Sequence, residues 1–100
     1  MNLGKRRPTP PGVILRVEFL NPLGISQSAF AAHLGVDRKT INRLINEPDY
    51  PVTPALALNL GSALSTSPEF WLNLSSRCLL WDELNAREEK LPDTLIKKKA

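Results

Sequence analysis

The sequence predicts an all-α protein that folds as one small domain with five helices. Apolar residues recur at helical spacing in the stretches that separate the nine prolines. Small polar residues suited to capping a helix N-terminus precede four of these stretches. Two of these capping residues are followed directly by proline, which is favoured at the first position of a helix. No stretch alternates apolar and polar residues as a half-buried strand does.

The first helix is expected over residues 11–20 (PGVILRVEFL), and the segment NPLG is expected to break it. The second helix begins after Ser26, a good N-cap, and Ile25 can pack on Phe30 inside the helix. It ends at Gly35, because glycine readily adopts the left-handed conformation that terminates helices.

Three further helices are expected to follow. After the N-cap residue Asp37 a helix runs to about Asn46, and the segment EPDYP ends it. Thr53 followed by proline starts the fourth helix, TPALALNLGSALS. Ser67 followed by proline repeats this signal and starts the longest helix, which continues through FWLNLSSRCLLWDELNAREEK.

The domain is expected at residues 11–90, between two tails. A flexible basic tail occupies residues 1–10, and a C-terminal tail occupies residues 91–100. The basic triplet KRR in the first tail fits either a frayed terminus or an arm that touches phosphates.

Charge is unevenly distributed along the chain. Residues 1–50 hold seven Lys and Arg against four Asp and Glu, whereas residues 51–100 hold six of each kind. This asymmetry favours a polyanion on one side of the molecule, although so mild an excess also serves solubility alone.

The composition argues against several other classes of protein. No apolar run is long enough to cross a bilayer and no signal segment opens the chain, so no membrane contact is expected. The single cysteine, Cys78, cannot form an intramolecular disulfide, which favours a reducing, cytoplasmic location. His33 is the only histidine, and Cys78 has no evident base partner. We therefore expect no metal site, no cofactor and no enzymatic activity.

The second and third helices carry a constellation typical of a helix-turn-helix motif. The small residue Ala31 lies where two helices can cross closely, Gly35 provides the turn, and Ile41 brings an aliphatic side chain to the crossing. Apolar residues at positions 30, 34 and 44 complete the pattern. Each feature alone is common, but together with both N-caps they favour this motif.

The third helix has an apolar side and a basic side. At about 100° per residue, Ile41, Leu44 and Ile45 form one stripe. Arg and Lys suit O6 and N7 of guanine, Asn suits adenine, and Gln and Thr can bond phosphate. Three cations on an isolated helix would be ordinary solvent-facing charge, but the turn and the small residue in register favour DNA. The candidate DNA-binding residues are Gln27, Arg38, Lys39, Thr40, Asn42 and Arg43.

The chain resembles the HigA-type antitoxins, a branch of the XRE-like, lambda-repressor-like helix-turn-helix superfamily. The resemblance rests on PPGVIL, FLNPLGISQSAFAAHLGVDRKTINRLIN and TPALALNLGSALSTSPEFWLNL, and it covers about residues 8–85. Many repressors share the helix-turn-helix part, whereas PPGVIL and TSPEFWLNL are more particular to antitoxins. The resemblance implies a homodimer that binds double-stranded operator DNA in its own promoter. It also implies a complex with a HigB-type toxin, a small mRNA-cleaving ribonuclease that the antitoxin silences.

The resemblance also implies roles for individual residues. Gln27 matches a position that contacts phosphate, and Thr40 matches one that contacts phosphate or base. The base-reading positions are matched by Arg38, Lys39 and Arg43. The turn after the third helix departs from the pattern, because relatives tend to carry a basic NGKR-like turn and this chain reads NEPDY. Fewer cations there predict weaker non-specific binding and a shallower salt dependence, or a chain that binds DNA poorly.

The longest helix is apolar on more than one side, which indicates burial on more than one side. We expect the half from Phe70 to Leu74 to lie in the domain core. Leu80, Trp81 and Leu84 are expected to form a dimer interface, because exposed aromatic and apolar patches favour interfaces. The alternative is a helix that threads only its own domain core.

Two other functions remain open at the level of the sequence. One is a plain transcriptional repressor without a toxin partner, from which a neighbouring gene of toxin length would distinguish an antitoxin. The other is a protein-binding adaptor that keeps the fold but has lost DNA binding, which the acidic NEPDY turn permits.

Overall fold

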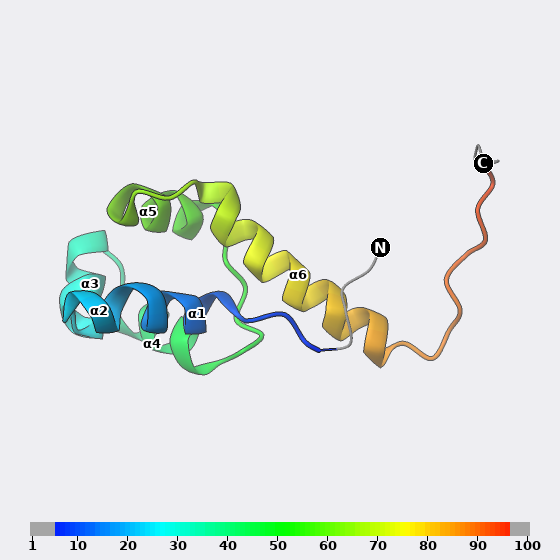
Figure 1. The fold of residues 1–100 in the computed structure, drawn as a ribbon, viewed down its shortest axis with the longest axis horizontal. Coiled ribbons are helices and arrows are strands. Elements are labelled where there is room, and N and C mark those ends of the chain that lie inside the picture. Colours follow the sequence, from blue (N-terminus) through cyan, green and yellow to red (C-terminus); the bar gives the residue numbers. More distant parts are fainter. Residues whose placement is uncertain (1–5, 97–100) are drawn as a thin grey trace.

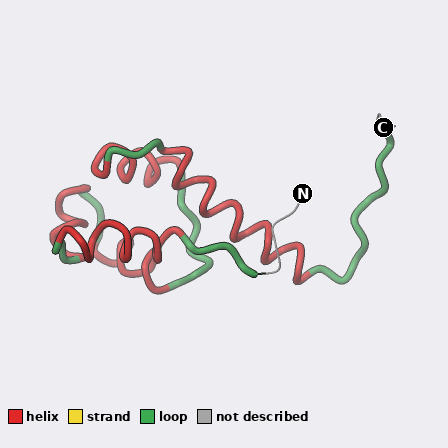
Figure 2. Tube along the Cα trace, in the orientation of Figure 1, coloured by secondary structure: helices red, strands yellow, loops and turns green. Residues whose placement is uncertain are grey.

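The computed structural model describes residues 6–96, and their regular structure consists of five helices (Figure 1). The first is a continuous helix made of α1 (Pro11–Ile14), the π-helical segment η1 (Leu15–Leu20) and α2 (Asn21–Leu23). The others are α3 (Gln27–Leu34), α4 (Arg38–Asn46), α5 (Pro54–Leu64) and α6 (Pro68–Ala86). Figure 2 shows only helices and loops over these residues, which confirms the all-α, five-helix prediction.

The first helix continues through Leu23, although the sequence predicts a break at Asn21. The backbone N–H of Asn21 donates to the carbonyl oxygen of Arg16, five residues earlier. This wider register accommodates Pro22, which has no N–H and would interrupt an α-helical ladder. Gly24 then ends the helix with a left-handed backbone, at φ 65°. The segment NPLG does terminate the helix, but at its glycine rather than at its first residue.

The four N-cap residues predicted from the sequence all cap their helices. Ser26 and Asp37 accept backbone N–H bonds at 3.1 Å and 2.9 Å, at the starts of α3 and α4. Thr53 and Ser67 do the same at 3.2 Å and 3.1 Å, for α5 and α6. Because the first N–H groups of a helix have no partner inside it, these bonds define where the helices begin.

All five helices contribute residues to the hydrophobic core, and α5 packs most extensively against α6. Trp71 is fully buried, and its indole N–H donates to Thr66 Oγ1 at 2.7 Å, so its polar atom is also satisfied. The other large side chains that are closed to solvent include Leu15, Ile41, Leu44 and Leu60.

Gly12 allows the first helix to approach α4 closely. A Cβ atom at this position would overlap the carbonyl oxygen of Leu44 and would lie 2.8 Å from Cα of Ile45. Both are backbone atoms of α4, so a larger residue fits only if one helix moves. The first helix therefore supports α4 from behind.

Helix α6 begins in the core and extends away from the other helices (Figure 1). Phe70 is 39% exposed, so the prediction that it belongs to the core is wrong; it lies about 100° around the helix from Trp71. The helix ends at Ala86 rather than near residue 90. Residues 87–90 are all charged and exposed, so no apolar contact holds a further turn. None of the described helices combines the length and apolar character needed to cross a membrane.

The segment before α1 lies along the outer half of α6 (Figure 1). Arg7 donates from Nε and Nη2 to the two carboxylate oxygens of Asp82, at 2.7 Å and 2.8 Å. It also donates from Nη2 to the carbonyl oxygen of Pro48 at 2.9 Å. The thiol of Cys78 donates to the carbonyl oxygen of Pro8 at 3.3 Å, and burial raises the pKa of this thiol. Residues 1–5 and 97–100 of the two expected tails lie outside the described residues.

Candidate nucleic-acid interface

Gly35 forms the turn between α3 and α4. Its φ of 72° is left-handed, and its N–H donates to the carbonyl oxygen of Ala32 at 3.2 Å. The N–H of Val36 donates to the carbonyl oxygen of Ala31 at 3.1 Å, which completes a Schellman-type helix end. Asp37 then caps α4 directly. The two helices are thus joined by a short turn whose backbone groups are satisfied, as the helix-turn-helix interpretation requires.

The two sides of α4 differ sharply in burial. Ile41 is 0% exposed and Leu44 is 1% exposed, and Ile45 packs against the same core. The other side faces solvent and carries the cations. Of the predicted DNA-binding residues, Gln27 and Thr40 are half-buried, and the exposed ones are Arg38, Lys39, Asn42 and Arg43.

A side-chain hydrogen bond joins α3 to the outward face of α4. Nδ2 of Asn42 donates to Oε1 of Gln27 at 3.2 Å. Gln27 is the first residue of α3, so this bond brings the start of one helix next to the middle of the other. Arg38, Lys39 and Asn42 also line one shallow depression together with Asp37. The structure therefore gathers most of the predicted residues on one surface.

Arg43 has protein partners of its own. Its Nε and Nη2 donate to the two carboxylate oxygens of Glu47, at 2.8 Å and 3.1 Å. Its guanidinium carbon lies 4.8 Å from the centre of the Tyr50 ring. The hydrogen bond with Arg43 holds the pKa of Glu47 below its usual range and raises the pKa of Arg43.

In the sequence, Glu47 stands out only as one of the two acidic residues of the NEPDY turn. In the structure, Glu47 and Tyr50 belong to the immediate surroundings of a candidate base-reading residue. The spacing of Arg43 and Glu47, four residues apart across the C-terminal end of α4, is a signal that could have revealed this pair. The aromatic contact has no such local signature.

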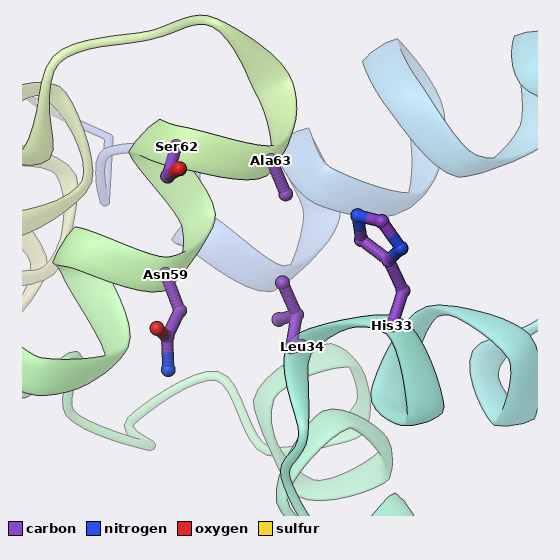
Figure 3. Close-up of a pocket in the computed structure, with 5 residues that line it drawn as sticks. All are labelled: His33, Leu34, Asn59, Ser62 and Ala63. Atoms are coloured by element: carbon purple, nitrogen blue, oxygen red, sulfur yellow. The ribbon is translucent and has the colours of Figure 1, made fainter.

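A second surface cleft lies between α3 and α5 (Figure 3). His33 and Leu34 line it from α3, and Asn59, Ser62 and Ala63 line it from α5. Among the residues that the structure describes, none that lines this cleft beside His33 carries a carboxylate or a second imidazole. Within residues 6–96, no three metal-binding side chains come together. This cleft therefore offers no group that would activate the imidazole or share a metal with it.

The outer half of α6 presents apolar side chains to solvent. Leu80 is 46% exposed and Leu84 is 45% exposed. Trp81, between them, is half-buried. Leu79 is also 39% exposed. The three residues predicted for a dimer interface therefore lie together on a part of α6 that the rest of the described chain leaves largely uncovered.

A short turn, a supporting helix packed from behind and a basic outward face on the second helix define a helix-turn-helix protein of the DNA-binding class. The sequence profile of the helix-turn-helix family matches residues 18–71. The chain is 43% identical to Antitoxin HigA-1 of Vibrio cholerae, over 90% of its own length and 84% of the relative's. It therefore belongs to the helix-turn-helix family and, within that family, to the HigA antitoxins.

Solved structures from Pseudomonas aeruginosa share this fold. Antitoxin HigA with the higBA promoter aligns with a TM-score of 0.73 and 35% identity, over 86% of this chain and 98% of that one. PA4674 in complex with its operator DNA aligns with a TM-score of 0.76 and 38% identity, over 84% of this chain and 88% of that one.

Proposed function

We propose that this protein is a DNA-binding antitoxin that represses its own operon as a homodimer. The observation that carries the proposal is the contrast between the two sides of α4. Its basic residues are exposed to solvent, while its apolar side is buried in the core. Relatives of the same fold have been solved with a promoter and with an operator, and these give the proposal independent support. Its action requires no catalytic step and takes place in the cytoplasm.

Residues of α4 read the bases, and residues from both α3 and α4 bind phosphate. Lys39 and Arg43 donate to O6 and N7 of guanine, and Arg38 assists them at the start of the helix. Asn42 reads adenine or keeps Gln27 in place through the bond between their side chains. Gln27 and Thr40 contact phosphate, and the positive end of α3 points the same way.

Dimerisation supplies the second half of the DNA site. A single recognition helix reads only a few base pairs, whereas two related by a two-fold axis read successive turns of the major groove, about 34 Å apart. Leu80, Trp81 and Leu84 form the contact between the two copies. Their exposed apolar surface supports this assignment, because burial against a second copy removes it from water.

The second partner is a HigB-type toxin, whose mRNA-cleaving activity the antitoxin silences. Membership of the HigA family supports this partner.

The exposed Asp49 in the turn after α4 adds a negative charge beside the DNA-binding face. We therefore expect a modest salt dependence of DNA binding, since each phosphate that is neutralised steepens it.

Co-purification and footprinting together test the proposed function. The tagged protein is co-expressed with the product of the adjacent gene, and the purified chain is footprinted on the DNA upstream of its own gene. We expect a stable complex and a protected inverted repeat. A footprint without a complex would indicate a plain repressor with no toxin partner. A complex without a footprint would indicate a protein-binding adaptor that does not bind DNA.

A further inference from the structure

The guanidinium of Arg43 is held from its side rather than from its end. Glu47 accepts one hydrogen bond from Nε and one from Nη2. A guanidinium has five N–H donors, one on Nε and two on each Nη atom. Both donors on Nη1 and one on Nη2 therefore point away from Glu47, and among the described residues no hydrogen bond uses Nη1.

The donors that remain form the fork that recognises guanine. A bidentate contact to O6 and N7 needs two parallel N–H groups from one face of the guanidinium. The end face, with one N–H from each Nη atom, provides that pair while Glu47 occupies the side face. Arg43 can therefore keep its ion pair and bind a base at the same time.

The turn after α4 holds both partners of Arg43. The N–H of Tyr50 donates to the carbonyl oxygen of Glu47 at 3.0 Å, which closes a β-turn with proline at its second position. Tyr50 packs against the core, so its ring has a fixed place under the guanidinium. Further along, the N–H of Val52 donates to Oγ of the buried Ser75 at 3.0 Å. The turn is thereby anchored to α6.

Holding Arg43 changes the balance between specific and non-specific binding. A free arginine side chain loses rotamer freedom when it binds a base, and one that is already held loses less. The negative charge of Glu47 also repels any phosphate, which weakens binding to every sequence alike. The first effect raises the ratio of specific to non-specific affinity, and the second lowers both affinities by a similar factor.

We propose that Glu47 and Tyr50 are positioning residues that hold Arg43 for end-on recognition of a guanine. Glu47, outside α4, is therefore a determinant of sequence specificity. This inference deepens the proposed function and rests on it. The acidic turn that departs from the family pattern then serves selective DNA binding rather than its loss.

The test compares the dissociation constants for two duplexes of equal length. One is the footprinted sequence from upstream of the gene, and the other is a shuffled version of it. Glu47→Gln keeps the shape of the side chain and removes its charge. We expect it to tighten binding to the shuffled duplex. The ratio of the dissociation constant for the shuffled duplex to that for the footprinted duplex should fall about tenfold. Because both constants come from the same sample, the ratio is insensitive to any misfolded fraction.

Asp49→Asn is the matched control, since it removes the same charge from the same turn but from a residue with no hydrogen bond to Arg43. We expect it to tighten binding to both duplexes by a similar factor and to leave the ratio unchanged. In an Arg43→Ala background, Glu47→Gln should no longer change the ratio. A ratio that Glu47→Gln leaves intact, or changes equally without Arg43, would overturn the proposal.

The role of Tyr50 is tested in the same assay. Tyr50→Phe keeps the ring face and should keep the ratio, whereas Tyr50→Leu removes the face and should lower it. Equal ratios for these two variants would contradict the role of the ring. A wild-type chain with no preference for either duplex would contradict the proposed function itself, and an intact preference that survives Glu47→Gln would contradict only this inference.

Discussion

Gly12 illustrates how one residue without a side chain holds the candidate DNA-binding helix in position. Its missing Cβ is the space that the backbone of Leu44 occupies. A Cβ atom at this position pushes α4 away from the first helix and so displaces the basic residues that α4 carries. Gly12 therefore affects the position of the candidate DNA-binding helix without lying on its outward face.

Gly12→Ala is expected to lower the free energy of unfolding by about 1–3 kcal/mol, because backbone atoms must move to admit the methyl group. Gly61→Ala provides a graded comparison, since its Cβ would lie 2.8 Å from the carbonyl oxygen of Thr66 and overlaps less. Urea titrations of both variants measure the difference. A Gly12→Ala protein as stable as the wild type would show that the two helices are not in this close contact.

The ion pair between Arg7 and Asp82 predicts a dependence of stability on pH. The hydrogen bond from Arg7 lowers the pKa of Asp82 in the folded state. A lowered carboxyl pKa gives stability that is present above the ordinary value of about 4 and is lost as the pH falls through the lowered one. Since the two side chains are 23% and 37% exposed, screening by water limits the contribution to about 1 kcal/mol or less.

Asp82→Asn tests this pair. We expect the variant to unfold more easily than the wild type at neutral pH, and the gap should close as the pH falls below about 4. Urea titrations across this range measure the gap. A gap of constant size at every pH would mean that the carboxylate charge of Asp82 contributes nothing.

Whether a contact between two residues can be predicted from the sequence depends on how far apart they lie along the chain. The N-caps at Ser26 and Asp37 are predictable, because a cap depends on residues only two or three positions away. The pair of Arg7 and Asp82 joins residues that are 75 positions apart, and no local pattern encodes it. The contact of Gly12 with α4 is long-range in the same sense.

At the scale of elements, the loop between α4 and α5 is attached to α6 by one buried hydroxyl. Ser75 is 5% exposed, and its Oγ accepts the N–H of Val52. Ser75→Ala leaves that N–H without a partner, so we expect a loss of about 1–3 kcal/mol in the free energy of unfolding. Ser76→Ala is the control, because Ser76 is the exposed neighbour on the same helix. Thermal unfolding that moves equally for both variants would contradict the anchoring role.

Element boundaries show where sequence reasoning falls short. Capping residues predict where four of the helices start. The end of the first helix is not predicted in this way, because it depends on a wider helical turn that accommodates Pro22. The end of α6 depends on whether residues 87–90 find anything to pack against, which is a tertiary question. The buried and exposed faces of α4 can be predicted from the sequence, because its apolar residues recur with the 3.6-residue period of an α-helix.

For the molecule as a whole, the proposed contact between two copies lies on the outer half of α6. Trp81→Glu would place a charge in an apolar contact, so we expect the protein to shift from dimer toward monomer. Leu58→Glu is the control, because Leu58 is 62% exposed on α5, outside this surface. Sedimentation velocity at matched concentrations measures both. An unchanged dimer in the Trp81→Glu variant would remove this residue from the interface.

The proposed repression depends on the reading of operator DNA by the outward face of α4. A gel-shift titration on the footprinted duplex tests it with Lys39→Ala and Arg43→Ala, each compared with Lys90→Ala, which removes an exposed cation beyond the end of α6. We predict that each α4 variant loses about tenfold or more in affinity and relaxes specificity at one position per half-site, whereas Lys90→Ala binds as the wild type does. Wild-type affinity in both α4 variants would contradict the base-reading role of this helix.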